Sequence, residues 1–243
     1  MNRHIAGCAL SFLAAALLSA GCAQKSVEKP GEDIVKQTRA DGDSTVYALA
    51  AAGTNDSILV FLTLPYDGAD PDTVNILEAL RQRRLYGRPQ VGDNVAILRN
   101  DSDSTVAERV IVTEQLTGTW CYKVYPHLRH QMGDGPLPPR LQQMLNEERE
   151  YGMTIKPTGT VFSIGAHARQ ADEQLPVAYP RAKNYGRWAI YNGRLILSEV
   201  KYTESTENTE VTVVSTDTAD FVRLRRDTLI LRFSDGERKF YKQ

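Results

Sequence analysis

Short runs in which apolar and polar residues alternate fill the second half of the chain and predict a series of β-strands. Turn sequences separate these runs, and Asn192-Gly193 is the strongest of them because this dipeptide favours the two-residue turn of a hairpin. We therefore predict that residues 114–243 form an antiparallel up-and-down barrel, which leaves no sheet edge unpaired. The predicted strands are LTGTWCYKVY, YGMTIKP, GTVFSIG, NYGRWAIYN, GRLILSEV, TEVTVVSTD, ADFVRLRR, DTLILRFS and ERKFYK.

Residues 44–113 show a different pattern, which predicts a small α+β unit. Two strands, VYALAAAG and SILVFLTL, are followed by a helix, with Asp70 as its N-cap, Pro71 in its first turn and Gly87 beyond its end. Two further strands, NVAIL and AERVIVTEQL, complete the unit. The whole chain is thus predicted to be mainly β.

The start of the chain has the three parts of an export signal. Arg3 and His4 precede the apolar run 5–20, and small residues precede Cys22. The run is too short to cross a membrane as a helix, because about 20 apolar residues are needed for that. The end of the run is similar to the site at which bacterial lipoproteins are cleaved. We expect residues 1–21 to be removed and Cys22 to carry lipid.

Residues 22–43 are predicted to be a flexible tether, because the stretch is charged and lacks aromatic residues. After cleavage and lipidation Cys121 is the one cysteine left, so no internal disulfide is expected. The formal net charge of the whole sequence is -1, which argues against nucleic acid as a partner.

The barrel segment resembles the lipocalin-like domains of lipoproteins from Bacteroidetes. Gly118-x-Trp120 is similar to the G-x-W of the first lipocalin strand, where the tryptophan closes one barrel end against a late arginine. The resemblance implies that Arg232 or Arg238 is that arginine. It also implies an outer-membrane lipoprotein of the bacterial envelope, with palmitate among the acyl chains on Cys22. The matching stretches are LTGTW, GMTI, GTV, NGRLIL and DTLIL, and the α+β unit resembles a region found ahead of such domains.

Residues 126–150 form a long polar insertion after the first barrel strand. Pro138-Pro139 followed by RLQQML predicts a short helix within the insertion. Two interpretations stay open, because such an insertion can either cover the mouth of the barrel or simply extend from it.

A barrel of eight strands can be filled by its own side chains or can hold one small ligand. The alternation alone does not separate these outcomes, because packing also demands apolar inward faces. The large side chains that we take as candidates for facing a ligand are Tyr122, Phe162, Trp188 and Phe221.

Metal binding is weakly indicated. His127, His130 and His167 could hold zinc together with a water molecule, but a H-x-x-H pair without a helix or a carboxylate nearby is a poor signal. Asp70 and its neighbouring aspartates lack the spacing of a calcium loop, and helix capping explains them better. We therefore expect neither a metal nor another cofactor.

Catalysis is not indicated either. Cys121 lies mid-strand, where neither a base nor a helix N-terminus would activate it. The serine of FSIG lacks the first glycine of the G-x-S-x-G motif. No catalytic residue is nominated, and we expect a protein that is not an enzyme.

Two functions remain open. The first is a membrane-tethered binding protein whose barrel holds a small apolar or amphipathic ligand. The alternative is a structural or interaction module with a filled barrel that engages another envelope protein.

The lipid anchor gives a direct prediction. Cys22→Ala should release the protein from membranes, because no acyl chain can be attached, while its thermal unfolding stays unchanged. Fractionation of cells followed by immunoblotting checks this. A variant that still sediments with membranes would contradict the anchor.

Overall fold

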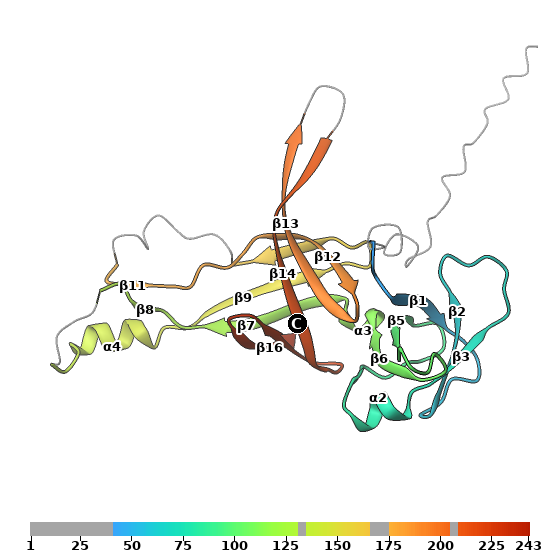
Figure 1. Ribbon diagram of the computed structural model, residues 1–243. Helices are drawn as coiled ribbons and strands as arrows, with labels where there is room; N and C mark the ends of the chain where they lie inside the picture. Colours follow the sequence, from blue (N-terminus) through green and yellow to red (C-terminus); the bar gives the residue numbers. More distant parts are fainter. Residues whose placement is uncertain (1–40, 131–134, 166–174, 205–208) are drawn as a thin grey trace, which may run out of the picture.

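The computed structural model describes residues 41–130, 135–165, 175–204 and 209–243 and consists mainly of two β-sheets (Figure 1). The export signal, Cys22 and nearly all of the tether lie outside the described residues, as does His167. Within the described part, none of the helices has the length and apolar character needed to span a membrane.

The first sheet is built by the N-terminal unit and has six strands in the order β3-β2-β1-β5-β6-β4. Its pairs are antiparallel except β4 with β6, which run parallel. Leu59, Phe61, Ile97 and Val110 are fully buried in a core of this unit's own. The strands are β1 Thr45–Ala50, β2 Ile58–Thr63, β3 Asp72–Asn75, β4 Leu85–Tyr86, β5 Asn94–Arg99 and β6 Ala107–Val112.

The predicted helix of this unit begins later than expected. It is α2, Leu77–Arg81, and the N-cap prediction for Asp70 is wrong, because strand β3 precedes the helix. Val74 is 1% exposed and pairs with Leu59 of β2, so burial in the sheet prevails over a helical start. The oxygen of the Asn75 side chain, rather than Asp70, accepts the Leu77 N–H at 2.9 Å.

The second sheet has eight antiparallel strands and forms a nearly closed barrel. Barrel strands that follow one another in the sequence are neighbours in the sheet, except β10 and β12 at its two edges, and the last strand pairs with the first. Asn192 and Gly193 both have positive φ, as the predicted hairpin turn requires. The strands are β7 Gly118–Val124, β9 Arg149–Ile155, β10 Val161–Ile164, β12 Tyr185–Tyr191, β13 Arg194–Glu204, β14 Thr209–Leu224, β15 Thr228–Phe233 and β16 Gly236–Lys242.

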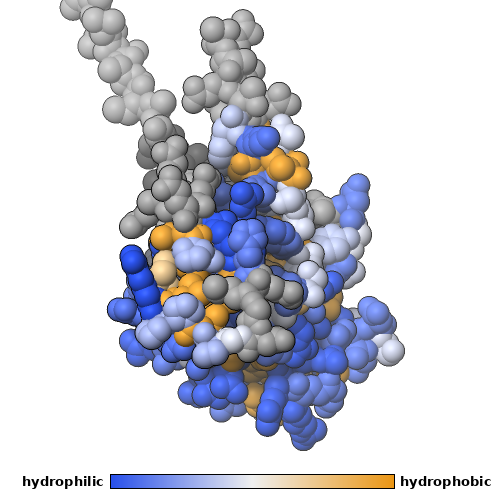
Figure 2. All heavy atoms as spheres, turned by 90° about the vertical axis from the view of Figure 1, so that its left-hand side faces the viewer, coloured by the Kyte–Doolittle hydropathy of each residue, from blue (hydrophilic) through white to orange (hydrophobic). Residues whose placement is uncertain are grey.

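Two of the nine predicted strands are parts of one continuous strand in the structure. TEVTVVSTD and ADFVRLRR form the continuous strand β14, which bends through irregularities in its pairing with β13 and with β15. Bulges of this kind change the direction of a strand without a turn. Beyond the barrel, β13 and β14 continue as a projecting hairpin on which Val213 and Val214 are about half exposed (Figures 1 and 2).

The barrel closes at a seam between β10 and β12. A single bridge joins Thr160 to Arg187. The backbone N–H of Trp188 donates to the Gly159 carbonyl at 2.8 Å, and its indole N–H donates to the Lys156 carbonyl at 2.7 Å. The tryptophan thus supplies bonds that a full strand ladder would otherwise provide.

The insertion forms an arm that extends from the barrel on the side away from the N-terminal unit (Figure 1). It contains β8 His127–Leu128 and α4 Pro139–Leu145, which confirms the predicted short helix. Strand β11, Val177–Ala178, pairs with β8 and joins the arm to the segment that leads into β12. The Arg149 guanidinium lies 3.7 Å from the centre of the Tyr179 ring, at the base of the arm.

The N-terminal unit and the barrel share one hydrophobic core. The Tyr47 hydroxyl donates to the carbonyl of Ile190 in β12, and the ring centres of Tyr86 and Phe221 are 5.3 Å apart. This unit therefore fills one end of the barrel. The shared core includes Tyr47, Tyr86, Ala96 and Ile111 from the first sheet and Ile190, Leu195, Ala219, Phe221, Leu224 and Leu229 from the barrel.

Polar contacts fix the same junction. The Arg109 guanidinium donates to the Gly193 carbonyl at 3.0 Å. The Asp43 carboxylate accepts the Asn192 N–H at 2.9 Å, while the Asn192 side chain accepts the Ser44 N–H at 2.7 Å. Helix α3, Thr113–Leu116, connects the two units and ends in the fully buried Leu116. The β12–β13 turn is thus held by Arg109 and Ser44 of the N-terminal unit and by Asp43, the last residue of the predicted tether.

Candidate functional site

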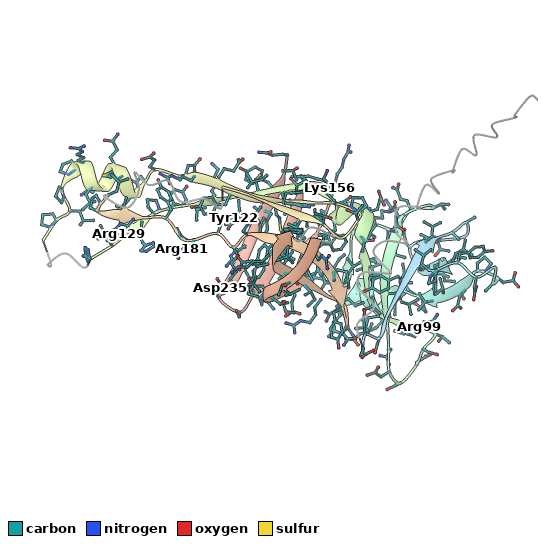
Figure 3. All side chains as sticks on the ribbon, turned by 90° about the horizontal axis from the view of Figure 1, so that it is seen from above. Arg99, Tyr122, Arg129, Lys156, Arg181 and Asp235 are labelled. Carbon is teal, nitrogen blue, oxygen red and sulfur yellow. The ribbon has the colours of Figure 1, made fainter. Side chains whose placement is uncertain are left out.

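The open end of the barrel contains a cavity of about 960 Å³. It lies at the beginning of β12, next to Tyr185, whereas the N-terminal unit contacts the end of the same strand. Figure 3 shows Tyr122, Arg181 and Asp235 around this end, between Arg129 on the arm and Arg99 in the N-terminal unit. The cavity thus opens toward the base of the arm, away from the filled end.

The inner wall of the cavity is apolar. Met153, Leu197, Phe233 and Phe240 line it and are buried among the barrel strands. The Tyr122 ring packs edge-on against Phe240, with 4.9 Å between the ring centres. A hydrocarbon group placed here would be removed from water by aromatic and aliphatic side chains.

A polar cluster interrupts this wall on one side. The Asp217 carboxylate accepts a hydrogen bond from the Tyr185 hydroxyl and pairs with the Lys183 ammonium at 2.6 Å. Partial burial acts to raise the pKa of Asp217, but the hydrogen bonds from Lys183 and Tyr185 prevail and hold this pKa below its usual value. Burial and the Asp217 carboxylate raise the pKa of Tyr185, which stays protonated at neutral pH.

Charged side chains surround the mouth. The Arg238 guanidinium lies 4.5 Å from the centre of the Phe233 ring and pairs with Asp235. Arg181 and Lys239 also line the cavity. The mouth is therefore lined by guanidinium and ammonium groups together with the carboxylates of Asp217, Asp235 and Glu237, while the apolar wall lies deeper.

The four residues predicted to face a ligand lie in three different environments in the structure. Tyr122 lines the cavity, while Trp188 and Phe221 are buried in the shared core at the filled end and do not line the cavity. The prediction for Phe162 is wrong, because its side chain is 55% exposed, with the Lys156 ammonium 5.6 Å from its ring centre. The register of β10 turns Val161 inward and leaves Phe162 outside.

Lys183, Tyr185 and Asp217 are the functional candidates that the sequence pattern did not reveal. One signal could have found Asp217. It alternates with Ala219 and Phe221 in β14, so a charged residue occupies a position on the inward, apolar face. Its partners come from β12 and the segment before it, and no local pattern connects these residues with β14.

The predicted barrel signature is buried. Trp120 is fully buried, and its indole N–H donates to the Leu116 carbonyl at 2.6 Å. The cation over its ring is the ammonium of Lys242, 5.0 Å from the ring centre. The expectation of Arg232 or Arg238 at this place is not met, because Arg232 pairs with Glu237 and Arg238 lies at the opposite, open end.

Gly118 permits this arrangement of Lys242 over Trp120. Its φ is +122°, and a Cβ at this position would lie 2.7 Å from the Lys242 Cε. Both residues of the predicted G-x-W signature therefore act in closing the filled end.

The histidine, cysteine and serine residues that were considered for metal binding or catalysis do not form a site in the described parts of the chain. Within the described parts of the chain, no three histidine, cysteine or acidic side chains are grouped closely enough to hold a metal. Burial raises the pKa of the Cys121 thiol to about 11, with Glu150 adding to the effect, so the thiol is protonated at neutral pH. The Ser163 hydroxyl donates to the Lys183 carbonyl at 3.1 Å and accepts the Tyr185 N–H at 2.9 Å. Its hydrogen bonds hold the seam of the barrel.

Comparisons with protein-family models, with curated proteins and with solved structures found no match. Inference about function therefore starts from the cavity.

The Asp217 pair predicts a pH dependence. Because the pKa of Asp217 is lowered on folding, its carboxylate contributes stability above about pH 4, and this is lost as the pH falls through the folded value. Asp217→Asn should be less stable than the wild type at neutral pH, and the difference should shrink below about pH 4. Urea unfolding at a series of pH values measures it.

Asp101→Asn, in an exposed loop, is the matched control and should differ little from the wild type at any pH. A constant difference between Asp217→Asn and the wild type down to about pH 3 would show that the carboxylate charge is not what stabilises the cluster.

Proposed function

We propose that the barrel binds a small amphipathic molecule in its open end and does not catalyse a reaction on it. The observation that carries the proposal is the cavity of about 960 Å³, with an apolar inner wall and charged residues at its mouth. Cavities that hold small ligands usually measure about 300–1,000 Å³ and combine mostly apolar lining with a few polar groups.

The two parts of the cavity would take two parts of the ligand. Phe233, Phe240 and Leu197 would cover an apolar portion, and each CH₂ group removed from water contributes about 0.8 kcal/mol. Arg238 and Lys183 would face the polar portion at the mouth. Both already pair with carboxylates, so a ligand would join an existing charge network rather than leave a charge unpaired.

The filled end of the barrel restricts the route by which a ligand could enter. Since the N-terminal unit packs into one end, a ligand would enter and leave by the other. Residues 180–183, which follow β11, line this mouth, so the position of the arm is linked to access. We include in the proposal that the arm covers the mouth. The reason is that residues 180–183 connect the arm to the mouth.

The cellular setting is part of the same proposal. The charged start, apolar run and Cys22 support a bacterial outer-membrane lipoprotein, and the succession of eight barrel strands is consistent with a lipocalin-like domain. The 22–43 tether would hold the barrel near the membrane surface, where amphipathic molecules are abundant.

A second candidate is the interaction module. The observation in its favour is the projecting β13–β14 hairpin, on which Tyr202, Val213 and Val214 are 49–58% exposed. Contiguous exposed apolar side chains often mark contacts with other proteins. In this alternative the cavity carries no ligand, so blocking its mouth leaves function unchanged.

Blocking the mouth tests the proposal. Ala182 lines the cavity and is half-buried, so Ala182→Trp should fill the entrance with an indole ring. Binding of anilinonaphthalene sulfonate, an amphipathic fluorescent anion, should weaken about tenfold or more, which corresponds to about 1.4 kcal/mol. Fluorescence titration measures this, and native mass spectrometry of the wild type should show a co-purified small molecule.

Ala189→Trp is the matched control, because Ala189 lies in β12 outside the cavity and should leave the affinity unchanged. Equal affinity in the wild type and both variants, together with no co-purified molecule, would reject ligand binding and favour the interaction module.

A further inference from the structure

A second cavity, of about 660 Å³, lies at the filled end of the barrel where the N-terminal unit meets it. Four parts of the chain come together there: the loop after β4, the end of α3, the β14–β15 turn and the last strand. We call this cavity the basic cleft. Its polar side chains are Arg88, Gln90, Asp93, Gln115, Arg225, Arg226 and Lys242.

The basic cleft has an excess of positive charge. Four of its side chains are cations, and Asp93 is its one carboxylate. That carboxylate already accepts the Gln90 N–H at 2.9 Å. Arg88 has an ion pair with Asp56 at 3.4 Å, but both side chains are about 80% exposed, so water screens the pair and it contributes little.

Backbone contacts fix the walls of the cleft. The Gln115 side chain accepts the Arg88 N–H at 3.2 Å and donates to the Arg88 carbonyl at 2.8 Å. The Gly87 N–H donates to the Leu224 carbonyl at 3.1 Å, which ties the loop of the N-terminal unit to the end of β14. Arg88 is thereby held beside the turn that carries Arg225 and Arg226.

Glycine is required for this close approach. Gly87 has a φ of +90°, and a Cβ there would lie 2.8 Å from both the Gln115 Oε1 and the Val112 Cβ. A side chain at this position would push the loop away from α3 and open the cleft.

Lys242 provides the most buried of the cations. Its ammonium lies 3.3 Å from the Gln115 carbonyl oxygen and over the Trp120 ring, as described above. Burial lowers the pKa of Lys242, and the nearby Glu114 carboxylate, which does not line the cleft, offsets only part of this effect. An anion in the cleft would compensate for the lost hydration of the ammonium.

We propose that the basic cleft binds a phosphate group. Arginine side chains bind planar or tetrahedral oxyanions through two N–H groups at once, and Arg88, Arg225 and Arg226 approach the cleft from both units. Several cations around a single acid suit a doubly charged phosphate better than a carboxylate. The phosphate could belong to a soluble molecule, as a doubly charged monoester, or to a phospholipid headgroup, as a singly charged diester, and in both sources the arginines would bind anionic phosphate oxygens.

Binding would connect the two units. A phosphate held by Arg88 of the N-terminal unit and by Arg225 and Arg226 of the barrel crosses their junction. A ligand that binds the folded protein but not the unfolded chain raises the melting temperature, and the rise grows with the logarithm of the ligand concentration once this concentration exceeds the Kd. This gives a measurement that needs no knowledge of the natural ligand.

The test compares the replacement of two arginines that line the cleft with the replacement of a neighbouring arginine that does not. The full-length protein, in detergent and at constant ionic strength, is titrated with inorganic diphosphate or with dihexanoyl phosphatidylglycerol while its Tm is recorded. Both probes should raise the Tm. In the double variant Arg225→Ala/Arg226→Ala the apparent Kd should weaken tenfold or more. Arg223→Ala is the matched control, since Arg223 is exposed on β14 but does not line the cleft, and it should respond as the wild type.

The two probes distinguish the sources of the phosphate. A Tm response to diphosphate alone, lost in the double variant, supports a soluble phosphorylated ligand, and a response to the lipid alone, lost in the same way, supports a headgroup. 1,2-Dihexanoylglycerol, which has the acyl chains but no phosphate, controls for binding of the acyl chains in the barrel cavity. The proposal is overturned if neither probe raises the Tm, or if the double variant responds as Arg223→Ala does.

Discussion

The packing of Tyr47, Tyr86 and Ile111 into one end of the barrel is the contact on which the rest of the structure depends. A barrel end lined with apolar side chains must be covered, because exposure of this surface to water is unfavourable. Here the cover comes from the preceding unit of the same chain, and the Tyr47 hydroxyl satisfies the Ile190 carbonyl at that end. The two sheets therefore behave as one folded body with a common core.

This packing makes the barrel asymmetric, and the asymmetry determines where ligands could bind. The filled end leaves the interior accessible at the opposite mouth, where Asp217, Lys183 and Arg238 stand beside an apolar wall. The junction itself leaves a groove at its rim, lined by Arg225 and Arg226. The barrel thus has an apolar cavity with a charged mouth at the end that the N-terminal unit leaves open, and the junction of the two units forms the separate basic cleft.

The sequence predicted the strands well because alternation and turn dipeptides are local signals. Asn192-Gly193 adopts the expected turn, and the short helix after Pro138 is present. The predictions were wrong where contacts with residues distant in the sequence determine the local structure. Val74 joins a sheet through pairing with β2, so the predicted helix starts later than Asp70 suggested. Phe162 lies outside because the register of β10 places Val161 inward.

The cavity and the cleft were less predictable than the fold. Asp217 could have been noticed as a charge among inward apolar positions, but its contact with Tyr185 depends on barrel closure. Lys242 over Trp120 replaces the expected arginine, and the final strand alone gives no sign of this. The docking of the N-terminal unit has no sequence signature at all, because its contacting residues look like ordinary core positions.

The most direct test of the shared core is the thermal unfolding of residues 114–243 without the N-terminal unit, followed by circular dichroism. We predict loss of the cooperative transition, because Ile190, Leu195, Ala219 and Phe221 would be left uncovered at the end of the barrel. Residues 41–243, which keep Asp43 and its hydrogen bonds at the junction, should unfold like the full-length protein. A cooperative transition of residues 114–243 at the Tm of the full chain would contradict the account.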